Sequence, residues 1–382
     1  MRFRSTEKLL PQTTEPQQKA DSAMHALHVV GARPNFMKCS AVMLALQAHG
    51  VRQTLVHTGQ HYDFNMSDIF LHDLGMREPD VNLQVGSGTH AEQTAAIISR
   101  FEPVVLQQDP DMVLVYGDVN STVAVALVCS KLMIPVAHVE AGLRSFDRTM
   151  PEEVNRVVTD HLCDLLLTPS ADANENLLRE GIGEHRIRLV GNVMIDTLTR
   201  LLPQARSMLP SDLPPRFALV TMHRPTNVDD PTFLRELLLT LYDIGHQLPV
   251  VFPMHPRTRR RAEDVGMHIF SNGNLLVTEP MSYLSFLAFQ ASATLVITDS
   301  GGVQEETTFL GVPCLTVREN TERPITTTMG TNILVGRNIK CLRVHIERIL
   351  HGGGVHGQVP PLWDGHAAKR VAEIVVSWRP PL

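Results

Sequence analysis

The sequence predicts an α/β protein of two domains, each built on a doubly wound parallel sheet. The chain has 382 residues, which is too long for one typical domain core. Short apolar runs rich in β-branched residues alternate with helical patterns. This alternation is typical of a parallel sheet covered by helices on both faces. It begins again after a proline-containing stretch at residues 202–216, so the pattern predicts a second sheet.

The first domain is expected at residues 24–190. A helical pattern follows the first of its expected strands, from about residue 35 to residue 48. The strand segments are ALHVVG, QTLVHT, DMVLVYG, IPVAHV, DLLLTP and RIRLVG.

The second domain is expected at residues 191–364, with the boundary falling between 190 and 215. Helical patterns at 230–246 and 302–310 separate its strands, and a last one at 366–378 lies in a terminal segment, 365–382. The strand segments are RFALVTM, LPVVFPM, NLLVTE, ATLVITD and VPCLTV.

Composition excludes several classes of protein. The formal net charge of −6 argues against non-specific nucleic-acid binding, which needs a basic surface. No apolar run reaches the roughly 18 residues of a membrane span. Residues 1–23 are polar, without the apolar core of a secretory signal, and are expected to be a disordered extension. The five cysteines are scattered, which favours free thiols in a reducing compartment and a cytoplasmic location.

Two loops are suited to bind phosphates. GARPNFMK (31–38) follows the first strand and supplies Arg33 and Lys38 next to a helix start, where backbone N–H groups favour an anion. TDSGGVQEE (298–306) offers Ser300, Gly301 and Gly302 at another helix start. The alternative interpretation of the first loop is an ordinary strand-to-helix turn with solvated cations.

Two further side chains complete the expected nucleotide site. Glu306 lies one turn into the helix after Gly302, where its carboxylate can accept hydrogen bonds from ribose hydroxyls. RENTERP (318–324) brings Arg323, although this segment is equally consistent with a surface loop held by ion pairs.

Metal ions are not expected at this site. Asp109 and Asp111 form a D-x-D pattern, but they precede a strand and therefore lie at the wrong edge of the sheet for a ligand. His57 and His61 have helical spacing but no evident third ligand, so a zinc site is not predicted.

Carboxylates gather at the strand ends of the first domain. Asp118 follows DMVLVYG and Glu140 follows IPVAHV. Glu152 lies in the first turn of the helical pattern that comes next along the chain. Such crowding raises at least one carboxyl pKa and places a proton donor beside an acceptor. The alternatives are that Asp118 caps a helix and that Glu152 forms an ordinary ion pair with Arg156.

Histidines end two strands of the second domain. His223 and Arg224 follow RFALVTM, and His255 follows LPVVFPM, so both imidazoles are expected to face the phosphate loops. A lone histidine is more often structural, but two at adjacent strand ends favour a function.

Taken in order, these segments resemble the non-hydrolysing UDP-N-acetylglucosamine 2-epimerases, from residue 24 to the last helical pattern. The chain departs from the common pattern of that family at Asn35, Ile325 and Met281, where many members have Glu, Glu and Gln. The matching segments are GARPNFMK, HTGQHYD, GDVNST, HVEAGLRS, PEEVNR, GNVMID, HRPTNVDD, TDSGGVQEE and TERP followed by LVG.

The resemblance implies a glycosyltransferase-B arrangement of two Rossmann-like domains around a central cleft, with the last helix packed on the first domain. It implies a cofactor-free homodimer that interconverts UDP-GlcNAc and UDP-ManNAc for cell-surface polysaccharide synthesis. UDP leaves by anti elimination to give a 2-acetamidoglucal and then adds back.

The resemblance also assigns roles to individual residues. Asp118, Glu140 and Glu152 become the acid/base and cation-stabilising carboxylates, and His223 the acid on the phosphate side. The implied UDP-sugar contacts are Arg33, Lys38, Arg156, His255, Phe286, Ser300, Gly301, Gly302, Glu306 and Arg323.

Three other functions fit parts of the pattern. A glycosyltransferase of the same architecture would share the UDP loops but would not need three carboxylates in the first domain. A hydrolysing epimerase would release UDP and free N-acetylmannosamine. A non-catalytic sensor would bind the nucleotide sugar without turning it over.

Overall fold

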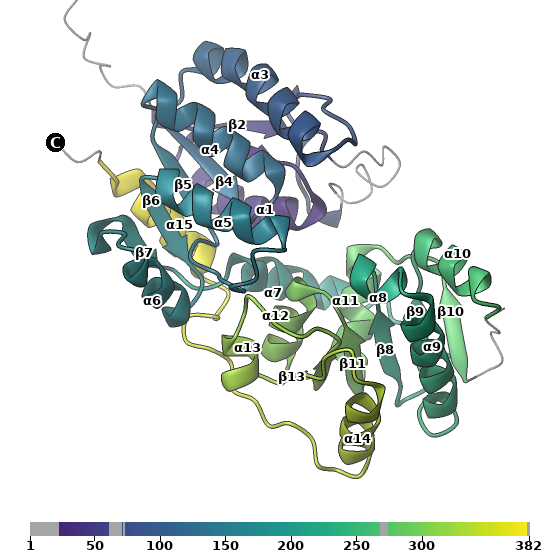
Figure 1. The fold of residues 1–382 in the computed structure, drawn as a ribbon. Coiled ribbons are helices and arrows are strands. Elements are labelled where there is room, and N and C mark those ends of the chain that lie inside the picture. Colours follow the sequence, from purple (N-terminus) through teal and green to yellow (C-terminus); the bar gives the residue numbers. More distant parts are fainter. Residues whose placement is uncertain (1–22, 61–70, 72, 268–273, 380–382) are drawn as a thin grey trace, which may run out of the picture.

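A computed structural model describes residues 23–60, 71, 73–267 and 274–379 (Figure 1). The predicted N-terminal extension, apart from residue 23, and His61 lie outside the described residues. Within the described part, the chain forms two parallel-sheet α/β domains, as the sequence predicted. No described helix has the length and apolar character needed to cross a membrane.

The N-terminal sheet has the strand order β3-β2-β1-β4-β5-β6-β7 and is parallel throughout. Its strands are β1 (His25–Val30), β2 (Arg52–His57), β3 (Val81–Asn82), β4 (Met112–Tyr116), β5 (Val136–Val139), β6 (Leu165–Thr168) and β7 (Ile187–Leu189). The helices between them are α1 (Arg33–Gln47), α3 (His90–Gln108), α4 (Asn120–Leu132), α5 (Pro151–Leu162) and α6 (Ala171–Arg179).

Both faces of this sheet are covered by hydrophobic cores. Side chains alternate along each strand, so successive residues point into opposite cores. In β4, Met112 and Leu114 join one hydrophobic core, while Val113 and Val115 join the other. This two-sided burial explains why the strand segments are apolar without a break.

The C-terminal sheet has the order β10-β9-β8-β11-β12-β13 and is also parallel. Its strands are β8 (Ala218–Thr221), β9 (Val250–Pro253), β10 (Leu275–Thr278), β11 (Leu295–Thr298), β12 (Cys314–Thr316) and β13 (Asn332–Leu334). The helices are α8 (Pro225–Val228), α9 (Pro231–Gly245), α10 (Pro256–Asp264), α11 (Tyr283–Ser292), α12 (Gly301–Leu310), α13 (Ile325–Thr328) and α14 (Ile339–Leu350).

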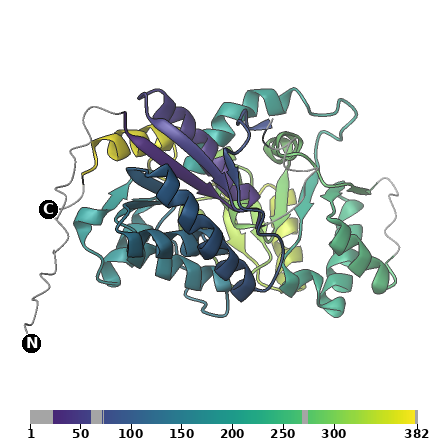
Figure 2. The same cartoon turned by 90° about the horizontal axis from the view of Figure 1, so that it is seen from above.

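Two helices connect the domains. The helix α7 (Val193–Arg206) contacts α1 on one side and α11 and α12 on the other. The last helix, α15 (Ala367–Ser377), packs on α1 and α7, and Figure 2 shows it beside the first strands and first helix of the chain. Asp196 of α7 accepts hydrogen bonds from the backbone N–H groups of Ala367 and Ala368 at 3.2 and 2.7 Å, which fixes the start of α15.

The structure differs from the sequence expectation in two details. The short strands β3 and β13 were not predicted, because two or three residues carry no recognisable period. The proline-containing stretch is not all linker: α7 continues to Arg206 with Pro203 inside its last turn. The exact domain boundaries stay predictions.

Candidate active site

The carboxyl ends of the two sheets face each other, and three of the residues predicted from the sequence, Lys38, Glu140 and Arg323, meet there. Asp118 and Glu140 follow β4 and β5 of the N-terminal domain, and Lys38 lies in α1. The C-terminal domain contributes the loops after β8, β11 and β12. Ligands of open parallel sheets bind at this edge.

Glu140 is held between cations of both domains. Its buried carboxylate is ion-paired with Lys38 and with Nη2 of Arg323, the latter at 2.9 Å. Burial alone would raise the pKa of Glu140, but the charges of Lys38 and Arg323 outweigh it and hold the pKa below its ordinary value. The carboxylate is therefore ionised at neutral pH, as a base must be.

Arg323 is surrounded by carboxylates. Besides Glu140, its guanidinium contacts Glu322, and its Nε lies 2.9 Å from Oε1 of Glu305. Glu322 also pairs with Arg318 at 2.7 Å, and these two arginines hold its pKa far below the usual range against the effect of burial. Burial raises the pKa of Glu305 to about 7, with the negative charge of Glu140 adding to the shift and Arg323 opposing it.

Asp118 is paired with Arg156, which does not use Glu152 as a partner. Arg156 donates to Asp118 and to Glu153, at 2.7 Å from Nη2 to Oε2 of Glu153. The ordinary Glu152–Arg156 pair considered from the spacing is therefore wrong. The buried Glu153 also accepts the backbone N–H groups of Ser145 and Phe146 at 3.0 and 2.8 Å, so it anchors the loop after Glu140.

Glu152 is exposed on the first turn of α5 and acts electrostatically on the other domain. Burial lowers the pKa of Arg224, and Glu152 is one of the acids whose charge opposes this shift. Of the two adjacent glutamates, Glu153 is thus built into the fold, while Glu152 is accessible on the side facing the C-terminal domain.

His223 is oriented by Asp299. Nδ1 of His223 lies 2.9 Å from Oδ1 of Asp299, which is completely buried, whereas the imidazole side chain is 55% exposed. Asp299 also accepts the backbone N–H of Arg224 at 2.9 Å and the side-chain amide of Asn227 at 3.1 Å. The carboxylate therefore keeps a proton on Nδ1 and directs Nε2 away from the sheet.

Gly301 connects the loop predicted to bind phosphate to the carboxylates. A Cβ atom at this position would lie 2.5 Å from Nη1 of Arg323 and 2.6 Å from Oε1 of Glu322. A larger residue at position 301 would have to displace these two side chains, so the start of α12 lies against the guanidinium that holds Glu140. Ser300 is the N-cap residue of the same ten-residue helix. The structure thus brings the loop at residues 300–302 next to Glu140.

The other predicted contacts have varied surroundings. Glu306 is buried and accepts a hydrogen bond from the Tyr283 hydroxyl at 2.9 Å, and burial raises its pKa to about 7. Phe286 of α11 packs against a core of the C-terminal domain. Arg33 is exposed at the start of α1, and His255 is an exposed N-cap residue of α10. Ligand contacts of these residues stay predictions.

Comparisons with known proteins identify the family. A family model described as UDP-N-acetylglucosamine 2-epimerase matches residues 44–376. The UDP-N-acetylglucosamine 2-epimerase of Methanocaldococcus jannaschii is 42% identical over 361 residues, which is 91% of this chain and 97% of the relative. The chain belongs to the UDP-N-acetylglucosamine 2-epimerase family. The resemblance found in the sequence is thereby confirmed, and the chain is an isomerase.

Two more comparisons define its place in the epimerase family. The UDP-2,3-diacetamido-2,3-dideoxy-D-glucuronate 2-epimerase of Pseudomonas aeruginosa is 40% identical and covers 93% of this chain, with 100% of that protein matched. The crystal structure of M. jannaschii UDP-GlcNAc 2-epimerase in complex with UDP-GlcNAc and UDP superimposes with a TM-score of 0.85. It has 41% identity and covers 92% of this chain and 99% of that one. The two-domain fold is therefore the epimerase fold.

Sequence reasoning missed four carboxylates of this epimerase site. The neighbour of Asp118 and Arg156 is Glu153, and Arg323 is partnered by Glu305 and Glu322. Asp299 holds His223. Asp299 had a recognisable signal, because an acidic residue at the end of an apolar strand is costly unless it is paired. For the adjacent pairs Glu152–Glu153 and Glu305–Glu306, only the helix phase in the folded protein separates the paired residue from its neighbour.

Within the described residues, no three His, Cys, Asp or Glu side chains are grouped so as to hold a metal ion. Asp111 accepts the backbone N–H of His25 at 2.8 Å, at the amino end of β1. The D-x-D pattern thus lies at the sheet edge opposite the candidate active site, where the sequence placed it.

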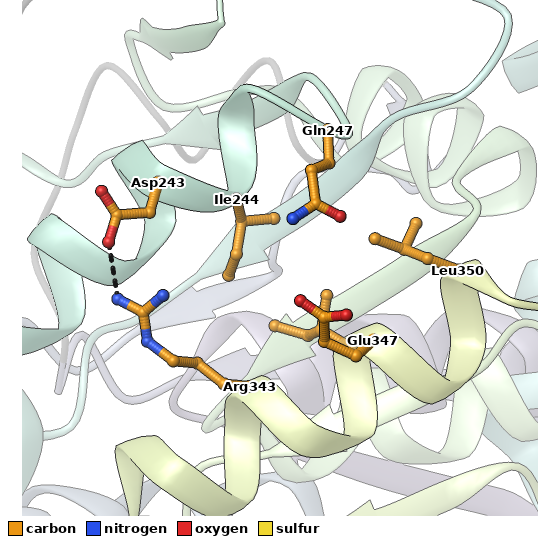
Figure 3. Close-up of a pocket in the computed structure, with 7 residues that line it drawn as sticks. Asp243, Ile244, Gln247, Arg343, Glu347 and Leu350 are labelled. Atoms are coloured by element: carbon orange, nitrogen blue, oxygen red, sulfur yellow. Dashed lines mark hydrogen bonds and ion pairs between the residues drawn. The ribbon is translucent and has the colours of Figure 1, made fainter.

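A surface pocket lies elsewhere on the C-terminal domain, between α9 and α14 (Figure 3). Arg343 forms an ion pair of 2.7 Å with Asp243 at its rim. The end of α9 leads into the amino end of β9, so this pocket is at the edge of the sheet opposite Gly301 and Arg323. We assign it no part in the epimerase reaction.

Proposed function

We propose that the protein reversibly inverts C2 of UDP-GlcNAc to give UDP-ManNAc, without net hydrolysis. One observation carries the proposal: Glu140, ionised and buried, is held between Lys38 of one domain and Arg323 of the other, beside the helix start at Gly301. This arrangement joins a base to the cations and backbone N–H groups that suit a diphosphate.

The reaction proceeds by elimination and addition. The C1–O bond breaks with its electron pair leaving on UDP, which places positive charge at C1 and acidifies the C2 proton. A carboxylate takes this proton, and the C2–H electron pair becomes the C1=C2 bond of a 2-acetamidoglucal. A proton then returns to C2 on the opposite face, and the UDP oxygen bonds again to C1. Atoms and electrons balance, and no redox step is required.

The leaving group is bound by the C-terminal domain. The diphosphate is proposed to bind among Ser300, Gly301, Gly302, Arg323 and His223. His223 delivers or accepts the proton on that side. Glu306 binds the ribose and Phe286 the uracil. Arg33, Lys38, Arg156 and His255 are the remaining proposed contacts with the nucleotide sugar.

The sugar ring lies against the N-terminal domain. Asp118, Glu140 and Glu152 surround it and share the tasks of base, acid and stabiliser of positive charge. A diphosphate that draws the charge of Arg323 away from Glu140 weakens one of the positive charges that lower the pKa of that carboxyl. Substrate binding therefore makes Glu140 a stronger base at the moment a proton must be taken.

The test is to incubate the purified protein with UDP-GlcNAc in D₂O and to follow the sugar by NMR. Conversion to UDP-ManNAc with deuterium at C2 supports the proposal. Transfer of the sugar to an acceptor without deuterium would indicate a glycosyltransferase, and UDP with free N-acetylmannosamine would indicate a hydrolysing enzyme. Unchanged substrate that nevertheless binds would indicate a sensor.

The same assay can test which substituents the enzyme prefers at C3 and C6 of the sugar. The P. aeruginosa relative is named for a substrate with two acetamido groups and a carboxylate at C6. Parallel reactions with UDP-GlcNAc and with the diacetamido glucuronate compare the two kcat/KM values. We propose that UDP-GlcNAc has the higher value.

We also propose that the enzyme is a cytoplasmic homodimer that feeds cell-surface polysaccharide synthesis. All five cysteines are free thiols, which supports a reducing compartment. Light scattering coupled to size-exclusion chromatography tests the dimer, and cell fractionation tests the location.

A further inference from the structure

A buried histidine lies between the turn that carries Asp118 and the turn that carries Glu140, which we call the two acidic turns of the N-terminal domain. His138 is in β5, two residues before Glu140, and its side chain is inaccessible to solvent. Nε2 of His138 lies 2.8 Å from the backbone oxygen of Gly117, the residue immediately before Asp118. The ring therefore links the strand that carries Glu140 to the turn that carries Asp118.

The other ring nitrogen of His138 is bound by a buried carboxylate from α5. Nδ1 of His138 lies 2.6 Å from Oδ1 of Asp160. Oδ2 of Asp160 accepts the backbone N–H of Gly142 at 3.1 Å and pairs with Arg144 at 2.7 Å. The pair His138–Asp160 thus holds Gly117 on one side and Gly142, two residues after Glu140, on the other.

Both acidic turns need such support. The backbone of Gly117, Glu140 and Gly142 has positive φ angles of 63°, 77° and 82°, respectively. Glycine adopts this region freely, but for Glu140 it is a strained conformation that persists only where surrounding contacts impose it. Glu140 is the strained residue. His138, two residues before it, binds Gly117, and Asp160 binds Gly142, two residues after it.

The chemistry of the partners fixes the direction of these bonds. A backbone carbonyl only accepts, so Nε2 of His138 donates to Gly117. Burial would raise the pKa of Asp160, but His138 and Arg144 hold it below its ordinary value, so this carboxylate is ionised and also accepts. His138 therefore donates from both ring nitrogens, which requires the protonated, positively charged ring, and the ionised Asp160 pairs with that charge.

We propose that His138 and Asp160 are positioning residues that set the distance and orientation between Asp118 and Glu140. The inference rests on the proposed epimerase function, in which a proton leaves one face of C2 and returns on the other. Two acids must then stand in a fixed relation to one ring, and an error of about 1 Å in their placement can cost on the order of 10²-fold in rate.

A misplaced acid has a specific consequence for the products. Elimination requires one carboxylate, but completing the inversion requires that the second protonates the glucal before it escapes. When the second step is slowed, UDP and 2-acetamidoglucal leave the enzyme. The ratio of released glucal to epimer therefore reports the relative placement of the two acids, which loss of stability alone does not change.

Two substitutions separate the two hydrogen bonds. In His138→Asn the amide nitrogen replaces Nδ1 and keeps the bond to Asp160, but the contact with Gly117 is lost. In His138→Gln the amide nitrogen replaces Nε2 and keeps the donor to Gly117. Asp160→Asn is a third variant that preserves the shape of the side chain, so the test does not depend on any one protein folding.

The matched control is His28→Gln. His28 lies in β1 of the same sheet, is equally buried, and bonds to Tyr116 Oη at 2.7 Å and to Gln53 Oε1 at 3.0 Å. Both bonds of His28 end on side-chain atoms, and neither involves the backbone of an acidic turn. Its replacement measures what the loss of a buried histidine costs without moving Asp118 or Glu140.

The experiment measures kcat, the glucal-to-epimer ratio from UDP-GlcNAc, and the Kd of UDP for each full-length protein. We expect His138→Asn and Asp160→Asn to lower kcat by about 10²-fold, to raise the glucal ratio, and to leave the Kd of UDP unchanged. His138→Gln should recover part of kcat, and His28→Gln should lower only the melting temperature.

The possible failures are distinct. Wild-type protein that forms no UDP-ManNAc overturns the proposed function. Active wild-type protein together with an unchanged kcat and glucal ratio in the His138 and Asp160 variants overturns the positioning role alone. Equal losses in His28→Gln and His138→Asn would also overturn it, because they would show a general effect of disturbing the sheet.

Discussion

Arg323 and Glu140 belong to different domains, and their side chains form an ion pair of 2.9 Å where the domains meet. The same guanidinium contacts the first helical turn at Gly301. Neither domain therefore contains the complete site. Opening the interface must break this pair, and a diphosphate that binds Arg323 must compete with Glu140 for its charge.

Arg323 should be required both for stability and for binding of UDP. In Arg323→Met, Glu140, Glu305 and Glu322 lose a shared buried cation, and breaking a buried ion pair in this way costs about 3–5 kcal/mol of unfolding free energy. We expect the Kd of UDP to rise at least about tenfold, since a charge-assisted bond contributes about 1.5–3 kcal/mol.

Arg323→Lys distinguishes charge from geometry. Lysine restores one positive charge but not three guanidinium contacts, so it should recover stability more than affinity. Calorimetry with UDP and thermal unfolding measure the two effects. The control is Arg337→Lys, which alters a half-exposed pair with Asp230. Equal Kd values for Arg323→Met and the wild type would contradict the phosphate-binding role.

Glu140→Gln should separate binding from catalysis. Removing a positioned base lowers kcat by about 10²–10⁴-fold, whereas Arg323 loses a competitor for its charge. We therefore expect the Kd of UDP to stay equal or fall. Proton NMR in D₂O follows loss of C2 exchange, and calorimetry follows UDP.

The control for Glu140→Gln is Glu175→Gln, an exposed glutamate of α6 paired with Arg179 at 3.0 Å. It should change neither kcat nor Kd. A Glu140→Gln protein that exchanges the C2 proton at the wild-type rate would exclude Glu140 from the reaction, and a large rise in the Kd of UDP would show that Glu140 organises the phosphate site instead.

The sequence predicted the fold well for a physical reason. Strands buried on both faces, such as β1 and β4, have to be apolar along their whole length, and such runs are visible without a structure. The residues after strands were equally visible, because polar groups at the end of a buried strand stand out. Asp118, Glu140 and His223 belong to this class, since each follows the end of a strand by one or two residues.

What the sequence did not reveal depends on contacts between distant segments. Glu152 and Glu153 are the same residue type, but the helix directs only Glu153 toward Arg156 and the loop at Ser145. The role of His138 was also hidden, because its two partners, Gly117 and Asp160, lie 21 and 22 residues away. The parallel register of β4 and β5 brings Gly117 to His138, and the packing of α5 on β5 brings Asp160 to it.

Asp299 should act through His223. Asp299→Asn keeps the size of the side chain but removes its negative charge and replaces one acceptor oxygen by an N–H donor. The preference for a proton on Nδ1 is lost, so the imidazole can adopt the wrong tautomer or turn. We expect kcat to fall about 10²-fold, by a factor similar to that of His223→Ala.

A double-mutant cycle tests whether Asp299 and His223 work as one unit. If they do, the protein with both substitutions should be no slower than the slower single variant, because residues that act together are not additive. Multiplicative losses in kcat would instead show that Asp299 contributes by a route independent of His223, through the backbone N–H of Arg224 and the side-chain amide of Asn227, which it also binds.

Glu306 should make the unliganded protein less stable as the pH rises. Burial raises the pKa of its carboxyl from 4.5 to about 7, so the folded state keeps a proton that the unfolded chain releases. Between about pH 4.5 and pH 7 the folded state binds more protons, and the unfolding free energy falls as the pH increases. At about 1.36 kcal/mol for each pKa unit, the full effect is about 3 kcal/mol.

Glu306→Gln removes this titration but keeps an oxygen that accepts the hydrogen bond from the Tyr283 hydroxyl. The variant and the wild type should melt at similar temperatures at pH 4.5, and the variant should become progressively more stable than the wild type up to pH 8. Glu347→Gln, in the helix α14 away from the site, serves as the control and should show no such trend. A stability difference that does not grow between pH 4.5 and 7 would mean that Glu306 is already ionised in the folded protein, ready to bind ribose hydroxyls without losing a proton.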